Sequence, residues 1–240
     1  MNAKLLIRKI LWTLGIDLMR FRHPFHPVWQ RRQMLAKQGV TLVLDVGANA
    51  GDFAVSMREE IGFRGRMISF EPLNDVHQQL QQLTARDANW TALNLALGDT
   101  DGESEINVSA NSVSSSLLDM LPAHADAAPT SIYSGRQKIT VRRLDSLRTE
   151  HCRPDDVIYL KLDTQGYEAQ VLAGAAETLA QVAVLQVELS MVPLYAGAPV
   201  ATEMITKLQQ MGFTLALLEP VFRDKTTHAL LQIDGVFLRS

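Results

Sequence analysis

The chain has 240 residues, of which 47% are hydrophobic and 20% are charged, and its net charge is −3; this size and balance fit one large or two small globular domains. Its single cysteine, Cys152, excludes an internal disulfide, a paired-cysteine zinc site and an iron–sulfur cluster. The longest uncharged run, residues 189–202, contains two prolines, so no segment offers the roughly 20 apolar residues of a membrane-spanning helix.

The first forty residues differ from the rest in charge. Residues 1–40 carry eight basic residues and one acidic residue, whereas residues 41–240 carry fifteen basic and twenty-five acidic residues. We predict a basic, helical N-terminal extension over residues 1–40, broken near the prolines of residues 23–27. At 100° per residue, one face of its first helix is apolar and the other is basic, with Leu6, Ile7, Ile10, Leu11 and Leu14 opposite Lys4, Arg8 and Lys9.

Two interpretations of this extension stay open. It docks on the sheet or on a second subunit, which would make a homo-oligomer, or it makes peripheral contact with an anionic membrane surface. No nucleic-acid partner is expected, because residues 41–240 are acidic and no basic–aromatic pattern occurs. Arg8 and Lys9 interrupt the early apolar run, which argues against a secretory signal. The expected location is therefore the cytoplasm, including the inner face of the membrane if the helix binds lipid.

From residue 41, short β-branched runs alternate with helical stretches. Continuous apolar strands that alternate with helices indicate an α/β domain with a parallel sheet covered on both faces. No clear helix separates the last two strands, so we predict that this pair is antiparallel. The predicted strands are residues 41–46, 66–71, 91–97, 156–162, 182–189, 213–218 and 234–239, and the predicted helices are residues 52–60, 75–86, 168–179 and 202–211.

Residues 100–143 do not fit this alternation. Two short strand-like pieces, residues 103–108 and 138–142, flank a Ser/Ala-rich stretch at residues 110–135. A loop this long inside a compact domain is usually functional or disordered. Because the stretch has few apolar anchors, we predict an insertion in the form of a mobile flap over one edge of the sheet.

The first predicted strand runs into a glycine-rich turn at residues 47–51. Gly47 and Gly51 allow a tight turn and the close approach of a ligand, and the helix that follows offers unpaired N–H groups. The dinucleotide fingerprint fails because Asn49 and Asp52 stand at the second and third glycine positions, and the lysine of a P-loop is missing. Asp45 disfavours a pyrophosphate and favours a ligand that carries an amine. A nucleotide-type pocket is predicted at this strand end.

Glu71 ends the second predicted strand and is followed by Pro72, which stops the strand. An acid in this place, some two dozen residues beyond the glycine turn, can accept hydrogen bonds from both hydroxyls of a ribose. Together, the turn and Glu71 indicate a ligand with a nucleoside part.

These two motifs and four others, in the same order, resemble the FkbM-type S-adenosylmethionine-dependent methyltransferases. The resemblance covers about residues 40–240 and implies the Rossmann-like class I methyltransferase fold, with six parallel strands and one antiparallel strand. It implies a methyltransferase domain over residues 41–240. The matching motifs are residues 44–53, 70–72, 94–99, 160–168, 171–175 and 187–188.

The resemblance also implies S-adenosylmethionine as the cofactor. The first motif would cradle its methionine part, Glu71 would hold the ribose, and residues 94–99 would border the adenine. It further implies methyl transfer to a small-molecule or glycan acceptor, with a hydroxyl of a sugar or natural product expected. An N-methyltransferase and a non-catalytic scaffold stay open as alternatives. The predicted cofactor-binding residues are Asp45, Gly47, Asn49, Gly51, Phe53, Glu71, Asn94 and Ala96.

Four residues are the catalytic candidates: Asp163, just past the fourth predicted strand, then Glu168, Lys161 and Glu188. A carboxylate among them would serve as the general base for a hydroxyl acceptor. No resident metal is expected, although the three carboxylates offer magnesium an alternative site. The competing interpretations are a helix-terminal acid for Glu168 and a buried ion pair for Lys161 and Glu188. Gln165 departs from the family, which usually has glutamate there.

Overall fold

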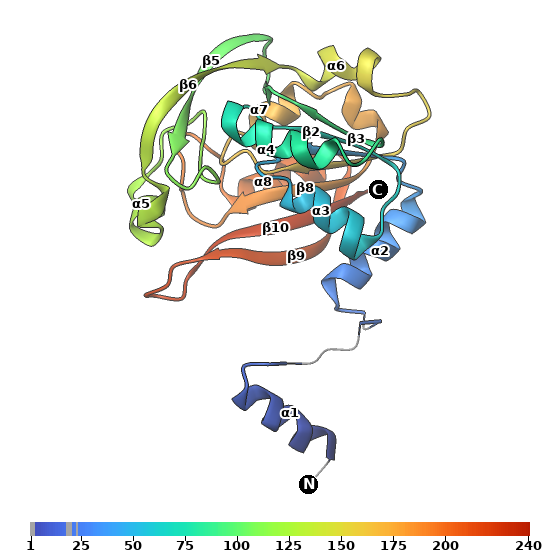
Figure 1. Ribbon diagram of the computed structural model, residues 1–240, viewed down its shortest axis with the longest axis vertical. Helices are drawn as coiled ribbons and strands as arrows, with labels where there is room; N and C mark the ends of the chain where they lie inside the picture. Colours follow the sequence, from blue (N-terminus) through green and yellow to red (C-terminus); the bar gives the residue numbers. More distant parts are fainter. Residues whose placement is uncertain (1–2, 18–20, 23) are drawn as a thin grey trace.

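The computed structural model describes residues 3–17, 21–22 and 24–240. It confirms the predicted α/β class: a seven-stranded, mostly parallel sheet lies between two layers of helices, and a three-stranded sheet stands beside it (Figure 1). The large sheet has the order β3-β2-β1-β7-β8-β10-β9. Its strands are β1 (Leu42–Val46), β2 (Arg66–Phe70), β3 (Trp90–Leu93), β7 (Ile158–Leu162), β8 (Val182–Ser190), β9 (Phe213–Arg223) and β10 (Leu230–Arg239).

Strand β1 lies at the centre, parallel to β2 on one side and to β7 on the other. Its register sets Asp45 beside Ser69 of β2 and Lys161 of β7. At the far edge, β10 is antiparallel to both β8 and β9, which confirms the predicted antiparallel ending. Because β10 lies between β8 and β9, the other six strands all point the same way. Their carboxyl ends therefore meet along one edge of the sheet, where ligands of such sheets bind.

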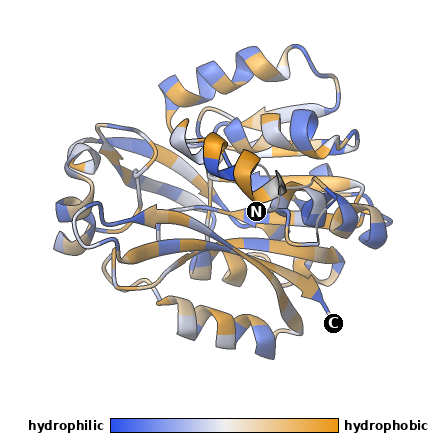
Figure 2. Ribbon diagram, turned by 90° about the horizontal axis from the view of Figure 1, so that it is seen from below, coloured by the Kyte–Doolittle hydropathy of each residue, from blue (hydrophilic) through white to orange (hydrophobic). Residues whose placement is uncertain are grey.

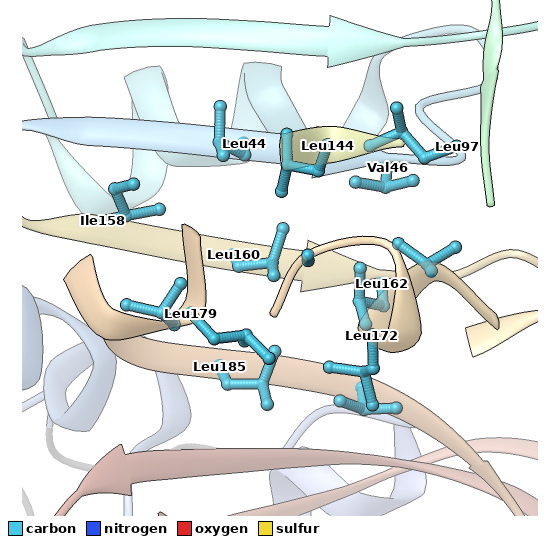
Figure 3. Packing of buried hydrophobic residues seen from close by; sticks show 14 of the residues in the cluster. Leu44, Val46, Leu97, Leu144, Ile158, Leu160, Leu162, Leu172, Leu179 and Leu185 are labelled. Atoms are coloured by element: carbon cyan, nitrogen blue, oxygen red, sulfur yellow. The ribbon is translucent and has the colours of Figure 1, made fainter. Parts of the chain in front are cut away.

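Side chains alternate between the two faces of the large sheet, and each face has its own helix layer. Helices α2 (Pro27–Gln38), α3 (Asp52–Ser56) and α4 (Asn74–Thr84) cover one face, and a π turn, η1 (Met57–Ile61), continues α3. The other face is covered by α6 (Leu144–His151), α7 (Glu168–Ala173), the short turn η3 (Thr178–Gln181) and α8 (Ala201–Gln210). Figure 3 shows leucines of β1, β7 and β8 packing under this second layer.

The predicted strand at residues 91–97 is split between the two sheets. Its first part is β3, and its second part is β4 (Ala96–Leu97), which pairs with β6 of the small sheet. Asn94 lies between them, and its side-chain amide donates to the backbone carbonyls of Glu71 at 3.0 Å and Pro72 at 3.1 Å. These bonds hold the chain where it leaves one sheet for the other.

The small sheet forms around the segment at residues 100–143. Strands β5 (Gly102–Ser109) and β6 (Tyr133–Arg142) are antiparallel, and the chain between them carries α5 (Pro122–Ala127) and a short turn, η2 (Pro129–Ser131). The stretch is anchored through buried serines as well as apolar side chains. Ser114 and Ser131 share a hydrogen bond of 3.1 Å, and Ser116 Oγ donates to the Gln165 carbonyl at 2.7 Å. Leu118 and Met120 pack against a buried cluster that contains Tyr195. The few apolar side chains of the stretch are thus supplemented by polar anchors, and the mobility of this flap stays a prediction.

The predicted helical extension forms two helices, α1 (Ala3–Thr13) and α2, on either side of the predicted break. Helix α1 lies away from the sheet and its helices (Figure 1). Helix α2 packs on the sheet, where Leu35 is buried beside Val43 and Ile61. Helix α2 shares the core of the residues that follow it, so residue 40 does not separate two hydrophobic cores. The division into domains at this residue stays a prediction. None of the helices in the described ranges combines the length and apolarity needed to span a membrane.

Candidate active site

A cavity opens where the carboxyl ends of β1, β2 and β7 meet the small sheet. Three of its walls come from the turns after these strands, and the fourth comes from β4, β5 and the serine-rich stretch. The cavity is lined by Gly47, Asn49, Glu71, Pro72, Leu73, Ala96, Leu97, Ile106, Ser112, Val113, Ser115, Leu117, Asp163, Thr164, Gln165 and Tyr167.

The glycine turn after β1 is shaped by contacts within the protein. Gly47 has a φ of +76°, and a Cβ atom there would lie 1.9 Å from the carbonyl oxygen of Asp163. Gly51 has a φ of +95°, and its Cβ would lie 2.8 Å from Leu80. The sequence suggested that these positions leave room for a ligand. The structure instead assigns the space beside Gly47 to the β7 turn and the space beside Gly51 to α4.

Glu71 ties the β1 turn to the chain that follows β2. One carboxylate oxygen accepts the N–H of Asn49 and the other accepts the N–H of Leu73, both at 2.8 Å. The side chain is buried but lines the cavity. Burial raises the pKa of Glu71 to about 7, although the two N–H groups oppose the rise. Each carboxylate oxygen accepts one of these N–H groups and keeps a further lone pair.

Asn49 connects the same turn to the serine-rich stretch. Its side-chain amide donates to Ser112 Oγ at 3.2 Å, and its side-chain oxygen accepts the N–H of Ala50 at 2.8 Å. With a φ of +46°, Asn49 adopts the left-handed conformation that asparagine tolerates better than most residues. The two cavity walls are thus linked across their rim.

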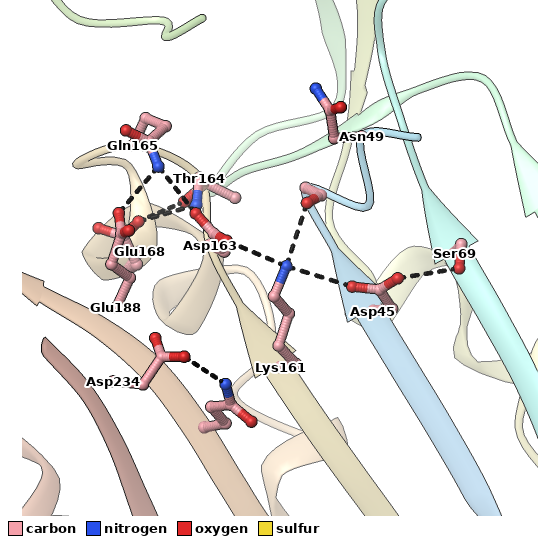
Figure 4. Close-up of polar contacts among 12 residues, drawn as sticks. Asp45, Asn49, Ser69, Lys161, Asp163, Thr164, Gln165, Glu168, Glu188 and Asp234 are labelled. Atoms are coloured by element: carbon pink, nitrogen blue, oxygen red, sulfur yellow. Dashed lines mark hydrogen bonds and ion pairs between the residues drawn. The ribbon is translucent and has the colours of Figure 1, made fainter. Parts of the chain in front are cut away.

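Asp45 lies behind the cavity and does not line it. It is fully buried, with one oxygen 3.1 Å from Ser69 Oγ and the other 3.3 Å from Lys161 Nζ (Figure 4). The sequence predicted that Asp45 would meet an amine of the ligand. In the structure this amine is supplied by Lys161, because the β1–β7 register places the two side chains beside each other on one face of the sheet.

Lys161 joins the two turns at the back of the cavity. Its Nζ lies 3.2 Å from Asp163 Oδ2 and donates to the Gly47 carbonyl at 3.1 Å, and the ring of Phe53 covers it at 5.5 Å. Burial would lower the pKa of Lys161, but the charges of Asp163 and Asp45 outweigh it and raise the pKa. Lys161 is therefore a fixed cation between two carboxylates.

Asp163 brings a carboxylate to the cavity surface, where its side chain is 33% exposed. Besides the Lys161 contact, it accepts a hydrogen bond of 2.8 Å from the Gln165 side-chain amide. The same amide donates to Glu188 at 2.9 Å, and the Gln165 side-chain oxygen accepts the Tyr195 hydroxyl at 2.6 Å. An amide can donate to two carboxylates at once, and an ionised glutamate at position 165 could not.

Glu168 and Glu188 are buried and do not line the cavity. Glu168 accepts the N–H groups of Thr164 at 2.8 Å and Gly166 at 3.2 Å, so it holds the β7–α7 turn. Glu188 accepts the amides of Gln165 and Gln232, and burial raises its pKa. The described residues contain no group of three or more side chains placed to hold a metal ion. The considered magnesium site is not formed, because these carboxylates face amide donors.

The remaining predicted cofactor residues divide between the cavity and its support. Ala96 lines the cavity, whereas Phe53 packs against Tyr159 and Lys161, and Asn94 bonds to the backbone outside it. Sequence reasoning missed most of the apolar wall. Leu97 lies within residues 94–99, which the resemblance implies would border the adenine, and Leu73 follows the motif that contains Glu71. The rest comes from distant segments that no local signal connects to the turn, namely Ile106, Val113, Leu117 and Tyr167.

Similar solved structures include an FkbM methyltransferase from Methylobacillus flagellatus KT, with a TM-score of 0.48 and 14% identity over 82% of this chain and 43% of that chain. The chain therefore aligns with less than half the length of that protein. Another is magnesium protoporphyrin IX methyltransferase from Synechocystis PCC 6803 with bound SAM, with a TM-score of 0.47 and 10% identity over 100% of this chain and 98% of that chain. A third is fibrillarin from Aeropyrum pernix, with a TM-score of 0.46 and 12% identity over 87% of this chain and 74% of that chain.

Among curated proteins, no sequence matches this chain significantly. The family model described as the methyltransferase FkbM domain does match, over residues 45–215. The match begins at Asp45, at the end of β1, and ends within β9, so it includes the glycine turn, Glu71 and Asp163. The chain belongs to the FkbM family of methyltransferases.

Proposed function

We propose that this protein transfers a methyl group from S-adenosylmethionine to a hydroxyl group of a sugar or another natural-product scaffold. The observation that carries the proposal is one cavity with two carboxylates on opposite sides of the Gly47 turn, Glu71 after β2 and Asp163 after β7. Glu71 lies near the apolar residues of the cavity, and Asp163 lies at the carboxyl end of β7.

The residues around Glu71 fit the nucleoside part of this cofactor. The carboxylate can accept the ribose hydroxyls while it holds the N–H groups of Asn49 and Leu73. Leu73, Leu97 and Ile106 offer apolar surface to a flat base. A sulfonium carries a positive charge, and the carboxylates at the cavity favour it.

The residues around Asp163 fit the transfer step. When bound, S-adenosylmethionine supplies an electrophilic methyl group, and the protein mainly supplies alignment. Asp163 is placed to accept a hydrogen bond from the acceptor hydroxyl and to take its proton. Lys161 and Gln165 each hold one of its oxygens, so the direction of the carboxylate is fixed before the acceptor arrives.

A polyhydroxylated small molecule or glycan is supported as the acceptor by the polar residues that line the cavity, among them Ser112 and Ser115, and by the family resemblance. An N-methyltransferase would act on a neutral amine in the same place. A non-catalytic scaffold would keep the fold without turnover. A hydroxyl acceptor gives a methyl ether, an amine acceptor gives a methylated amine and a scaffold gives no product, so analysis of the product separates the three.

The proposal is tested with tritiated S-adenosylmethionine, a panel of glycosides and hydroxylated aromatic scaffolds, and mass spectrometry of the product. We expect methyl ethers. Asp163→Asn should reduce turnover by about 10²- to 10⁴-fold, because a general base is lost. The matched control is Asp155→Asn, since Asp155 is exposed before β7, at the opposite end of the strand.

Cofactor affinity separates a catalytic from a structural role for Asp163. It should change by less than about threefold in Asp163→Asn, because the nucleoside part is held elsewhere. Near-normal turnover of Asp163→Asn with a proven acceptor would contradict its role as base. Methylated amines as the sole products would replace the hydroxyl acceptor with an amine.

A further inference from the structure

Helix α1 carries an apolar surface that the methyl-transfer site does not use. The exposed fractions of Ile7, Ile10 and Leu14 are 58%, 55% and 68%. The helix lies away from the sheet in Figure 1, and its ribbon is coloured both orange and blue in Figure 2. Isolated apolar side chains are common on protein surfaces, but a row of them along one helix indicates a binding surface.

These side chains are arranged as in a helix that lies at a membrane interface. At 100° per residue, Ile7 and Ile10 fall within one narrow sector of α1, and Arg8 and Lys9 fall outside it. Leu14 follows in the turn directly after the helix. Trp12 stands on the basic side, where the Arg8 guanidinium lies 5.0 Å from its ring. Tryptophan is enriched at the level of lipid headgroups, where an apolar ring with a polar edge fits.

Charge identifies the partner. Residues 1–40 hold eight of the basic residues and only one acidic residue, whereas the rest of the chain has an excess of acidic residues. The one acidic residue, Asp17, pairs with Arg8 at 2.7 Å, and Arg31 of α2 pairs with Glu219, so the excess positive charge lies on the remaining basic residues of this part. An anionic surface attracts this part and repels the remainder. A second copy of the helix would instead bring like charges together.

We propose that α1 binds the surface of an anionic lipid bilayer, with its apolar face in the headgroup region and its basic face toward lipid phosphates. The 11 residues of α1 are too few to span a bilayer, so the helix lies in the plane of the surface. The large sheet and its cavity then stay in water beside the membrane. This inference does not depend on the identity of the methyl acceptor.

The experiment is co-sedimentation of the full chain with phosphatidylcholine vesicles, with and without phosphatidylglycerol. Two variants leave the charge unchanged: Ile10→Gln on the apolar face and Leu5→Gln, about 140° away around the helix. We expect binding only to vesicles with phosphatidylglycerol, weakened by added salt. Ile10→Gln should weaken it by about tenfold, because one buried apolar side chain is lost. Leu5→Gln should stay within about twofold.

Other outcomes overturn the proposal. Equal binding to both kinds of vesicle would contradict the role of charge. Equal losses of binding in the two variants would contradict binding through the apolar face. If wild type binds neither vesicle and is a dimer that Ile10→Gln converts to a monomer, a second copy covers the helix. If wild type binds neither vesicle and is a monomer, the helix has no lipid role. Unchanged melting temperatures of the variants show that the fold is intact.

Discussion

Glu71 does two tasks that pull its pKa in opposite directions. Its burial favours the protonated form and raises the pKa from 4.5 to about 7, whereas a ribose diol is held best by the ionised form. In the pH range between these two values, the folded protein binds a proton that the unfolded chain has released. The cofactor-free protein therefore loses stability as pH rises through this range.

This conflict predicts opposite pH trends for stability and for binding. From about pH 4.5 to about pH 7, the melting temperature of the free protein should fall by the contribution of this group, and the affinity for S-adenosylmethionine should rise. As the pH is lowered below about 7, the affinity should fall by up to about tenfold for each pH unit. Thermal melts and calorimetric titrations of wild type and Glu71→Gln check both trends.

In Glu71→Gln, both pH trends should flatten, because the titrating group is gone. If the affinity of the wild type stays about the same from pH 5 to pH 8, the ionised form of Glu71 is not what binds the cofactor.

The sequence predicts which residue types stand at the strand ends, but it does not predict every contact among them. Glu71, Gly47 and Asp163 each follow a predicted strand, and all three line one cavity. The Asp45–Lys161 pair was not predicted, because it depends on the residue-by-residue register between β1 and β7, which the alternation of strands and helices does not establish. Gln165 was noticed only as a departure from the family, and its three side-chain contacts explain why an amide suits the position.

Two turns, one after β1 and one after β7, are packed so closely that they act as one structural unit. Gly47 lies against the backbone of Asp163, and Lys161 bonds to both turns. The position of Asp163 in the cavity therefore depends on the absence of a side chain at residue 47.

Two glycines separate the cost of crowding the turns from the cost of the backbone conformation. Gly47 and Gly62 have nearly the same φ, +76° and +79°, but a Cβ at Gly62 meets nothing within 4 Å. Gly62→Ala should cost about 1–2 kcal/mol of unfolding free energy, for the left-handed backbone alone. Gly47→Ala should cost more than about 3 kcal/mol, because the turns must also separate. Urea unfolding measures both, and equal costs would contradict the packing of the turns.

The predicted boundaries of a strand agree with the structure where its apolar run stays in one sheet. They differ where the chain passes from one sheet to another. The apolar run at residues 91–97 continues through Asn94, and only the hydrogen bonds of Asn94 to the backbone after β2 show why it changes sheet. The serine-rich stretch differs for another reason: its serines are buried partners of one another and of the β7 turn, and polarity alone indicated exposure.

At the scale of the whole molecule, the alternation of strands and helices predicted a parallel sheet with a ligand site at its carboxyl edge, and the cavity lies there. The place of β10 between β8 and β9 could not come from that alternation, because an antiparallel strand can be added at either side of its hairpin partner. Likewise, the charge step at residue 40 does not coincide with the packing, since α2 belongs to the same core as α3 and η1.

Calorimetric titration of the full chain with S-adenosylmethionine measures cofactor binding itself and requires no knowledge of the acceptor. We predict binding of one cofactor per chain, weakened by about tenfold or more in Glu71→Gln, since a charged hydrogen bond to the ribose is lost. The matched control, Glu59→Gln, changes an exposed glutamate on η1 and should bind like wild type. Absence of binding by the folded wild type would show that the cavity does not hold this cofactor, and affinity of Glu71→Gln within about twofold of wild type would show that Glu71 does not hold the ribose.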